Sequence, residues 1–150
     1  MKTIMETVKA FFQNAEWNYE ELNEKLIRSG IKGDESDFDL IFHCEEEQQT
    51  LVLIGLKTNL VPEAFRPKAA ELLTRANYIL NLGSYGLDYS DGEFRFRVGI
   101  DIEDGKLSIA MVRNMTFVTC RMLEQMYPCL MKLIYGNCDV DTLFEEWKAK

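Results

Sequence analysis

Side chains able to do chemistry are few in this chain, and their spacing does not match a reactive site. His43 is the only histidine, and it adjoins Cys44 in a run that alternates like a β-strand. Neighbouring strand residues point to opposite faces, so these two side chains should not share a proton. Asp37 and Asp39 would share one strand face, but nothing around them indicates a pocket. The sequence therefore predicts no catalytic residue.

The cysteines do not indicate a metal site. Cys44, Cys120, Cys129 and Cys138 contain no C-x-x-C pair, and a single histidine cannot complete a zinc-binding set at any usual spacing. The chain also has no glycine-rich phosphate-binding motif. We expect free thiols in a reducing compartment, with neither a metal nor a cofactor.

Composition and charge narrow the class of protein further. The chain has 150 residues, of which 47% are hydrophobic and 28% charged, and this suits one globular domain over residues 1–150. The net charge of −8 comes without a basic cluster, which disfavours nucleic acid and anionic membrane surfaces as partners. No stretch approaches the ~20 apolar residues of a membrane span, and the N-terminus does not resemble a signal peptide. We expect a cytoplasmic protein.

One feature has functional interest, a row of methionines at nearly helical spacing. Its members are Met111, Met115, Met122 and Met126. Methionine side chains are flexible and polarizable, so a methionine-rich surface can adapt to different protein partners. The same spacing also fits the core face of a helix, which we favour for most of the row. A dimer seam or a partner groove is the other interpretation.

Helical periodicity predicts the helices that surround and carry this row. The first covers residues 2–12. The second begins after Pro62 and ends at Gly83, which we expect to be its left-handed C-terminal cap. A long helix covers residues 109–135, and a short one covers residues 141–147.

Alternating patterns predict the strands. Residues 37–44 and 50–57 should form an antiparallel hairpin, and the second strand is apolar on both sides, so we expect it to be central. Another hairpin turns at Asp91-Gly92, and the charged outward row of its second strand is typical of a solvated face. Residues 18–29 fit a short helix or an irregular strand. This order indicates an α+β protein, with helices packed on an antiparallel sheet.

Several runs resemble the bacterial YbjN-domain family, in particular its cyanobacterial members. The runs are Arg75-Ala76-Asn77-Tyr78, Leu82-Gly83-Ser84-Tyr85-Gly86-Leu87-Asp88, Asp91-Gly92-Glu93-Phe94-Arg95-Phe96 and Met126-Tyr127-Pro128-Cys129-Leu130. The resemblance covers roughly residues 17–137. It implies a fold similar to that of type III secretion chaperones, which commonly form homodimers, and a role as a sensory-transduction regulator. It supplies no catalytic residues.

These observations together predict a non-catalytic protein-binding module, chaperone-like or a regulatory adaptor. We expect a homodimer with an unidentified protein partner. The alternative is a small-ligand sensor, with its pocket between the sheet and the C-terminal helices. An enzyme is the least favoured class.

Overall fold

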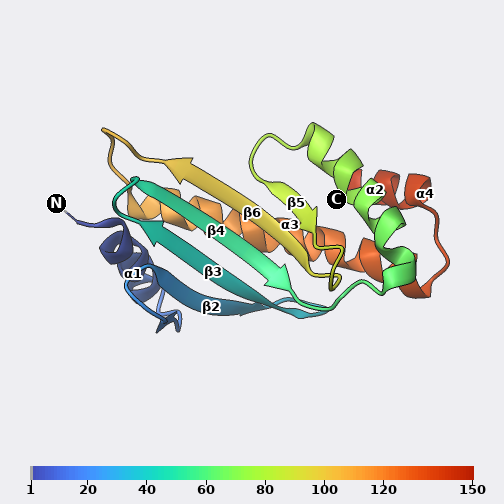
Figure 1. Ribbon diagram of the computed structural model, residues 1–150, viewed down its shortest axis with the longest axis horizontal. Coiled ribbons are helices and arrows are strands. Elements are labelled where there is room, and N and C mark those ends of the chain that lie inside the picture. The colour runs from blue at the N-terminus through green and yellow to red at the C-terminus, as the bar shows by residue number, and fades with distance from the viewer. Residues whose placement is uncertain (1) are drawn as a thin grey trace.

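A computed structural model describes residues 2–150, which form an antiparallel sheet with helices packed against it (Figure 1). The sheet has six strands in the order β1-β2-β3-β4-β6-β5. Their bounds are β1 Glu20–Glu21, β2 Leu26–Lys32, β3 Asp37–Glu45, β4 Thr50–Lys57, β5 Ser84–Leu87 and β6 Phe94–Asp101. The helices are α1 Ile4–Asn14, α2 Arg66–Ile79, α3 Ile109–Tyr135 and α4 Val140–Lys148, and a 3-10 turn, Glu63–Phe65, precedes α2.

The predicted strands are confirmed. β3 and β4 form the expected hairpin, in register from Asp39 opposite Leu56 to Glu45 opposite Thr50. β4 is central, because β6 pairs with its other edge. Residues 18–29, which fitted either a short helix or an irregular strand, contain β1 and the first part of β2. This segment is therefore extended and not helical.

The prediction that Gly83 caps α2 is wrong. α2 ends at Ile79, and Leu80 is already extended with φ −78° and ψ 137°. Gly83 does have a positive φ of 77°, but it lies at the entrance to β5, where an added Cβ would come within 2.5 Å of the Phe96 ring. The position needs glycine because of its backbone conformation and because β6 lies so close to it.

The helices cover one face of the sheet and its two ends. α3 contacts β4 and β6, α1 contacts β3, and the two helices contact each other, so both lie on the same side, which we call the inner face. α2 and α4 pack against each other beside β5, at the opposite end of the molecule from α1 (Figure 1). Within residues 2–150, no helix crosses the other side of β3 and β4, which we call the outer face (Figure 1).

The core lies between the inner face and α3. Phe42 of β3, Leu53 of β4 and Phe96 of β6 are fully buried, as are Leu123 and Met126 of α3. Each strand contributes every second residue, as the pleat requires. The helix lies close to β4 at Gly55, where an added Cβ would come within 2.5 Å of Leu123 and 2.7 Å of Thr119.

Buried hydrogen bonds attach α2 and α4 to the sheet. The Tyr85 hydroxyl of β5 donates a hydrogen bond to the Met122 carbonyl at 2.6 Å and accepts one from Trp147 Nε1 at 3.1 Å. The side-chain amide of Asn77 pairs with the Tyr85 backbone, accepting from its N–H at 2.7 Å and donating to its carbonyl at 2.9 Å. β5, α2, α3 and α4 therefore meet at one buried tyrosine.

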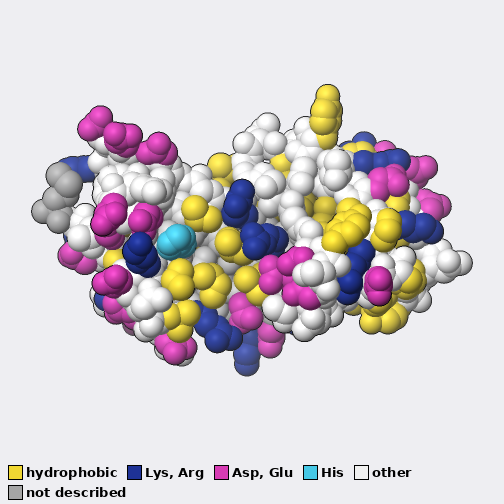
Figure 2. Space-filling model, in the orientation of Figure 1, with side chains coloured by type: hydrophobic (Ala, Val, Ile, Leu, Met, Phe, Trp, Pro, Cys, Tyr) yellow, Lys and Arg dark blue, Asp and Glu magenta, His cyan; other side chains and the backbone are white. Residues whose placement is uncertain are grey.

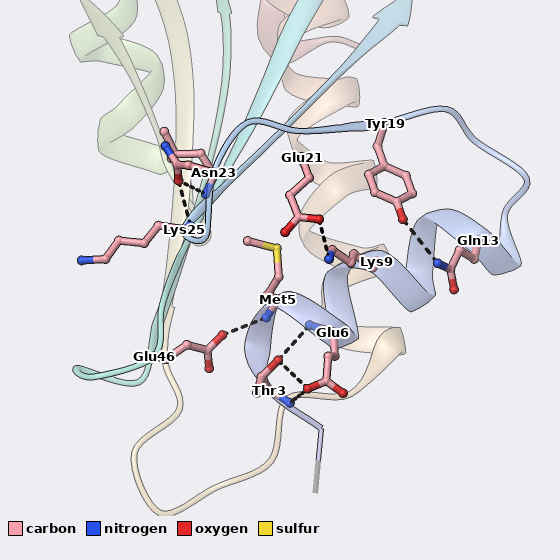
Figure 3. Close-up of polar contacts among 11 residues, drawn as sticks. Thr3, Met5, Glu6, Lys9, Gln13, Tyr19, Glu21, Asn23, Lys25 and Glu46 are labelled. Carbon is pink, nitrogen blue, oxygen red and sulfur yellow. Dashed lines mark hydrogen bonds and ion pairs between the residues drawn. The ribbon is translucent and has the colours of Figure 1, made fainter.

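The start of α1 is fixed by the turn between β3 and β4. Thr3 and Glu6 form a capping box, and the Glu46 carboxylate accepts hydrogen bonds from the Ile4 and Met5 backbone N–H groups at 3.0 Å each (Figure 3). A carboxylate at this place satisfies orphan backbone donors and complements the helix dipole. α1 is therefore attached to the sheet by its first turn.

Candidate protein interface

The structure buries half of the methionine row. Met126 is fully buried and Met115 is 6% exposed, whereas Met111 and Met122 are partly exposed. The interpretation of the row as a core face therefore accounts for Met115 and Met126. Whether Met111 and Met122 contact another protein stays a prediction.

The two partly exposed methionines also have contacts within the chain. The Met111 sulfur accepts a hydrogen bond from the Ser108 N–H at 3.4 Å, and Ser108 caps α3 as its sequence position indicates. The Met122 sulfur lies 3.7 Å from the Tyr85 hydroxyl. Both side chains thus support local structure, and a partner would meet only part of each.

The predicted separation of His43 and Cys44 is confirmed. His43 is exposed on the outer face, while Cys44 is buried on the inner face. Burial, and then the nearby Glu46 carboxylate, raises the pKa of the Cys44 thiol to about 12, so the thiol stays protonated at neutral pH. Within residues 2–150, no group of three or more His, Cys, Asp or Glu side chains is arranged to hold a metal ion.

The outer face carries apolar side chains that strand pairing brings into one patch. Cross-strand pairing aligns Arg28, Ile41, Ile54 and Arg97 in a single row over β2, β3, β4 and β6. The rows on either side add Leu26 and Val52 in one direction and Leu56 in the other. We call the partly exposed apolar residues Leu26, Ile41, Val52, Ile54 and Leu56 the outer strip.

A solvated sheet face usually carries polar residues opposite the buried row. β4 departs from this rule, because Val52, Ile54 and Leu56 on its outer side are all apolar. Figure 2 shows hydrophobic side chains gathered over the middle of this face, with basic side chains next to them. Contiguous apolar surface with a polar rim is typical of a protein interaction site.

Three arginines and three acidic residues border the outer strip. Arg28 lies 3.5 Å from Asp39, and Arg95 lies 3.4 Å from Glu93. Arg97 is exposed and has no acidic group within 4 Å among residues 2–150. Glu20 of β1 also stands next to Arg28 in strand register, so the border of the strip carries as many acidic as basic side chains.

A hollow lies at the edge of the sheet where β1 pairs with β2. β1 pairs with β2 only at Arg28 and Ile27, and beyond this pairing a wide hollow of about 930 Å³ opens between β2 and α3. Trp17, Ile31 and Phe117 are among its lining residues, and Phe117 is 57% exposed. This hollow is the feature that corresponds best to the alternative of a small-ligand pocket between the sheet and a C-terminal helix.

Inspection of the sequence missed the outer strip as a unit. Ile41 stands between the polar residues Asp39 and His43, and the outward row of β6 was interpreted as a solvated face. The signal was the apolar character of β4 on both sides, which correctly predicted a central strand. A central position explains why both edges of β4 are paired with other strands. It does not explain why β4 has apolar residues on both faces, which are buried only if something packs on each face.

Known proteins are similar to this chain in sequence and fold. The YbjN family, described as "Putative bacterial sensory transduction regulator", matches residues 5–131. The crystal structure of YbjN from E. coli is 13% identical, with a TM-score of 0.56, and covers 89% of this chain and 92% of that chain. A chain of the ExsC-ExsE complex is 16% identical, with a TM-score of 0.57 and coverages of 83% and 90%.

A further solved structure is the HopA1-SchA chaperone-effector complex, at 20% identity, a TM-score of 0.46 and coverages of 77% and 85%. No curated protein matches the chain at a significant level. No helix within residues 2–150 has both the length and the apolar character needed to cross a bilayer. The α+β fold similar to type III secretion chaperones is confirmed. Since the family match spans most of its length, the chain belongs to the YbjN family.

Proposed function

We propose that this chain is a non-catalytic protein-binding module, chaperone-like or a regulatory adaptor, which acts in the bacterial cytoplasm. The observation that carries the proposal is the outer strip, a patch of apolar side chains over β2, β3 and β4 that no helix within residues 2–150 covers. Burying such a surface against a partner releases free energy in proportion to the apolar area removed from water.

The comparisons support this proposal at the level of fold and family. The ExsC-ExsE structure is a complex of two proteins, built in part on the fold that this chain shares. The family description names sensory transduction, a process in which regulators act through contacts with other macromolecules. Regulation by protein contact fits both the family and the open sheet face.

We also propose that the chain forms a homodimer. β5 pairs only with residues 94–97 of β6, so the edge of β6 at residues 98–101 has no neighbouring strand within residues 2–150. An unpaired strand edge offers backbone donors and acceptors to a second copy. Met111 and Met122 remain predicted contributors to a dimer or partner surface.

The test is native mass spectrometry of the tagged protein, gently purified from its source cells. The wild type is expected as a dimer that carries a protein partner. The variant Ile41→Thr/Ile54→Thr should lose the partner, because it removes apolar area while keeping β-branched side chains on the strands. Leu82→Thr is the matched control, since Leu82 is 49% exposed and lies outside the outer strip.

Each outcome decides a separate part of the proposal. A partner that stays bound to Ile41→Thr/Ile54→Thr would exclude the outer strip as the binding surface. A wild type without any protein partner would reject the protein-binding function, and a monomer mass would reject the homodimer.

The small-ligand sensor is the second candidate, and the hollow beside Trp17 and Phe117 is the observation that favours it. It predicts a small added mass in the same spectra and a ligand-dependent rise in melting temperature. Phe117→Ser should abolish that rise, because it removes the exposed ring from the wall of the hollow.

A further inference from the structure

We infer that two copies of this chain join their sheets through the last residues of β6, in one defined antiparallel register. This inference rests on the proposed homodimer and specifies its geometry and the residues in contact. It follows from the hydrogen-bonding pattern of β6, from the charges on its outer side and from the protection of the opposite sheet edge.

The hydrogen-bonding pattern of β6 shows which residues face which neighbour. In an antiparallel sheet, successive residues direct their backbone N–H and C=O groups to opposite sides. The Ile102 N–H donates to the Gln49 carbonyl at 2.8 Å, in continuation of the pairing with β4. The Asp88 N–H donates to the Glu93 carbonyl at 3.0 Å, in continuation of the pairing with β5. Even-numbered residues of β6 therefore bond to β4, and odd-numbered residues face β5.

Two residues of β6 consequently have backbone groups that face an open edge. β5 reaches only as far as Arg97 and lies beside one end of β6 (Figure 1). Beyond that point the odd-numbered residues are Gly99 and Asp101, and no strand within residues 2–150 pairs with them on this side. Their two N–H and two C=O groups are available to a strand from outside the chain. We call residues 98–101 the free edge.

The opposite edge of the sheet is better protected. On β2, the Gly30 carbonyl accepts a hydrogen bond from Trp17 Nε1 at 3.1 Å, and the Ser29 hydroxyl donates to the Asn18 carbonyl at 2.7 Å. Residues 17–18 therefore lie along that edge. The free edge has no comparable cover within residues 2–150, and it contains neither proline nor lysine, which often keep edge strands from pairing.

One register uses every free group of both copies. If Gly99 of each copy pairs with Asp101 of the other, four backbone hydrogen bonds form around a two-fold axis at Ile100. A register centred on Gly99 would instead require Arg97 to pair with the other copy, but Arg97 already pairs with Ser84. The two-fold axis is perpendicular to the sheet, so the outer strips of both copies would face the same side.

The side chains on the outer side of this contact are complementary. Arg97 and Asp101 are both exposed, and neither forms an ion pair within residues 2–150. In this register Arg97 of each copy stands diagonally opposite Asp101 of the other, within reach of a long side chain. Gly99 lies between them on the same side of the strand and has no side chain to obstruct the contact. The Asp101 Oδ1 atom accepts from the Glu103 N–H at 2.9 Å, which leaves Oδ2 for the arginine.

The first experiment reverses these charges in two separate variants of the full chain. Arg97→Glu would place two carboxylates together at each end of the contact, and Asp101→Lys would place two cations there. Each variant alone should weaken the dimer at least tenfold in sedimentation equilibrium. An equimolar mixture should form a heterodimer about as tightly as the wild type, because opposite charges meet again at both ends. Arg121→Glu, at an exposed position of α3, is the control and should leave the dimer unchanged.

The second experiment tests the register. Ile100 would face its own counterpart in a non-hydrogen-bonded pair, with the Cα atoms about 4.5 Å apart, and a disulfide can bridge this distance. Ile100→Cys treated with oxidised glutathione should therefore become linked at position 100 at least tenfold faster than Tyr89→Cys. Tyr89 is 56% exposed and lies outside the contact. Peptide mapping by mass spectrometry distinguishes this link from links through the four natural cysteines.

The possible failures are distinguishable. A wild type that stays monomeric overturns the homodimer and this contact together. A dimer that ignores both charge reversals, or that they weaken without recovery in the mixture, overturns the contact and leaves the homodimer standing, as does a dimer that Ile100→Cys does not link. The protein-binding function is tested separately by Ile41→Thr/Ile54→Thr, whose positions lie outside the free edge.

Discussion

The two sides of β4 carry similar residues and have different surroundings. On the inner side, Leu51 and Leu53 are fully buried under α3. On the outer side, Val52 and Ile54 are just as apolar but partly exposed. Because the residues alternate along one strand, they share its backbone conformation and differ only in what covers them.

The apolar residues on the two sides of β4 therefore have different roles, one in folding stability and the other in partner binding. Apolar residues on the inner face hold the fold together by excluding water within the chain, so their loss should appear in the free energy of unfolding. Apolar residues on the outer face have no such cover within residues 2–150, so their loss should appear in binding. Variants at adjacent positions measure the two contributions separately.

The largest effect is expected from a pair of neighbouring alanine substitutions. Leu53→Ala removes a fully buried side chain and should lower the free energy of unfolding by about 2–5 kcal/mol. Ile54→Ala, on the outer side, should cost less than about 1 kcal/mol. Urea denaturation of both variants checks this, and equal losses would show that the outer face is also part of the core.

A second pair of substitutions tests how closely the two faces are packed. Gly55→Val would bring its Cβ within 2.5 Å of the Leu123 side chain, so the buried side chains of α3 must repack, at a cost of about 1–3 kcal/mol. Gly99→Val, on the outer side of β6, meets Val52 at an ordinary 3.4 Å and should change stability by less than about 0.5 kcal/mol. Comparable melting temperatures for both variants would contradict the close approach of α3.

The pH dependence of stability should report the burial of Cys44. An unfolded cysteine ionises near pH 8.5, whereas the pKa of folded Cys44 is raised to about 12. Between these values the folded chain keeps a proton that the unfolded chain loses. Cys44 should therefore lower the free energy of unfolding as pH rises through this window, and its own contribution is at most about 1.4 kcal/mol per pH unit.

The control for this pH dependence is Cys44→Ala. Its slope above pH 9 should be smaller than that of the wild type, although Cys120 and Cys129 still contribute, since burial raises their pKa values to about 12 and about 11. Identical slopes in denaturation curves collected at several pH values would show that the Cys44 thiol is accessible in the folded chain.

The smallest effect is expected for two arginines that border the outer strip. Arg28→Gln/Arg97→Gln should change the free energy of unfolding by no more than about 0.5 kcal/mol, since exposed ion pairs contribute little to stability. Thermal denaturation checks this. A large loss of stability would mean that the arginines support the fold, and the effect of Arg97 on dimer formation would then need another explanation.

Local patterns were sufficient to predict most of the secondary structure. β3 alternates clearly, β4 is a short apolar run rich in β-branched residues, and the Asp91-Gly92 turn allows the next hairpin because Gly92 adopts a φ of 78°. These features depend on residues within one turn or one strand.

Features that depend on distant residues could not be predicted in this way. Gly83 carries the backbone conformation of a helix cap, but its position is set by the Phe96 ring on another strand. The outer strip likewise exists only because register brings Ile41 of β3 opposite Ile54 of β4. The sequence shows which residues are apolar, but the order and register of the strands determine which of them become neighbours.

The close approach at Gly55 has a consequence for how the outer face would meet a partner. Leu123 and Thr119 of α3 occupy the space that a side chain at this position would fill, so the helix and the strand are closely packed there. The platform under the outer strip is thus pre-organised, and the entropic cost of ordering during association would fall mainly on the incoming segment. On binding, the rate of amide hydrogen exchange should therefore change little in the strands and fall strongly in the bound partner segment.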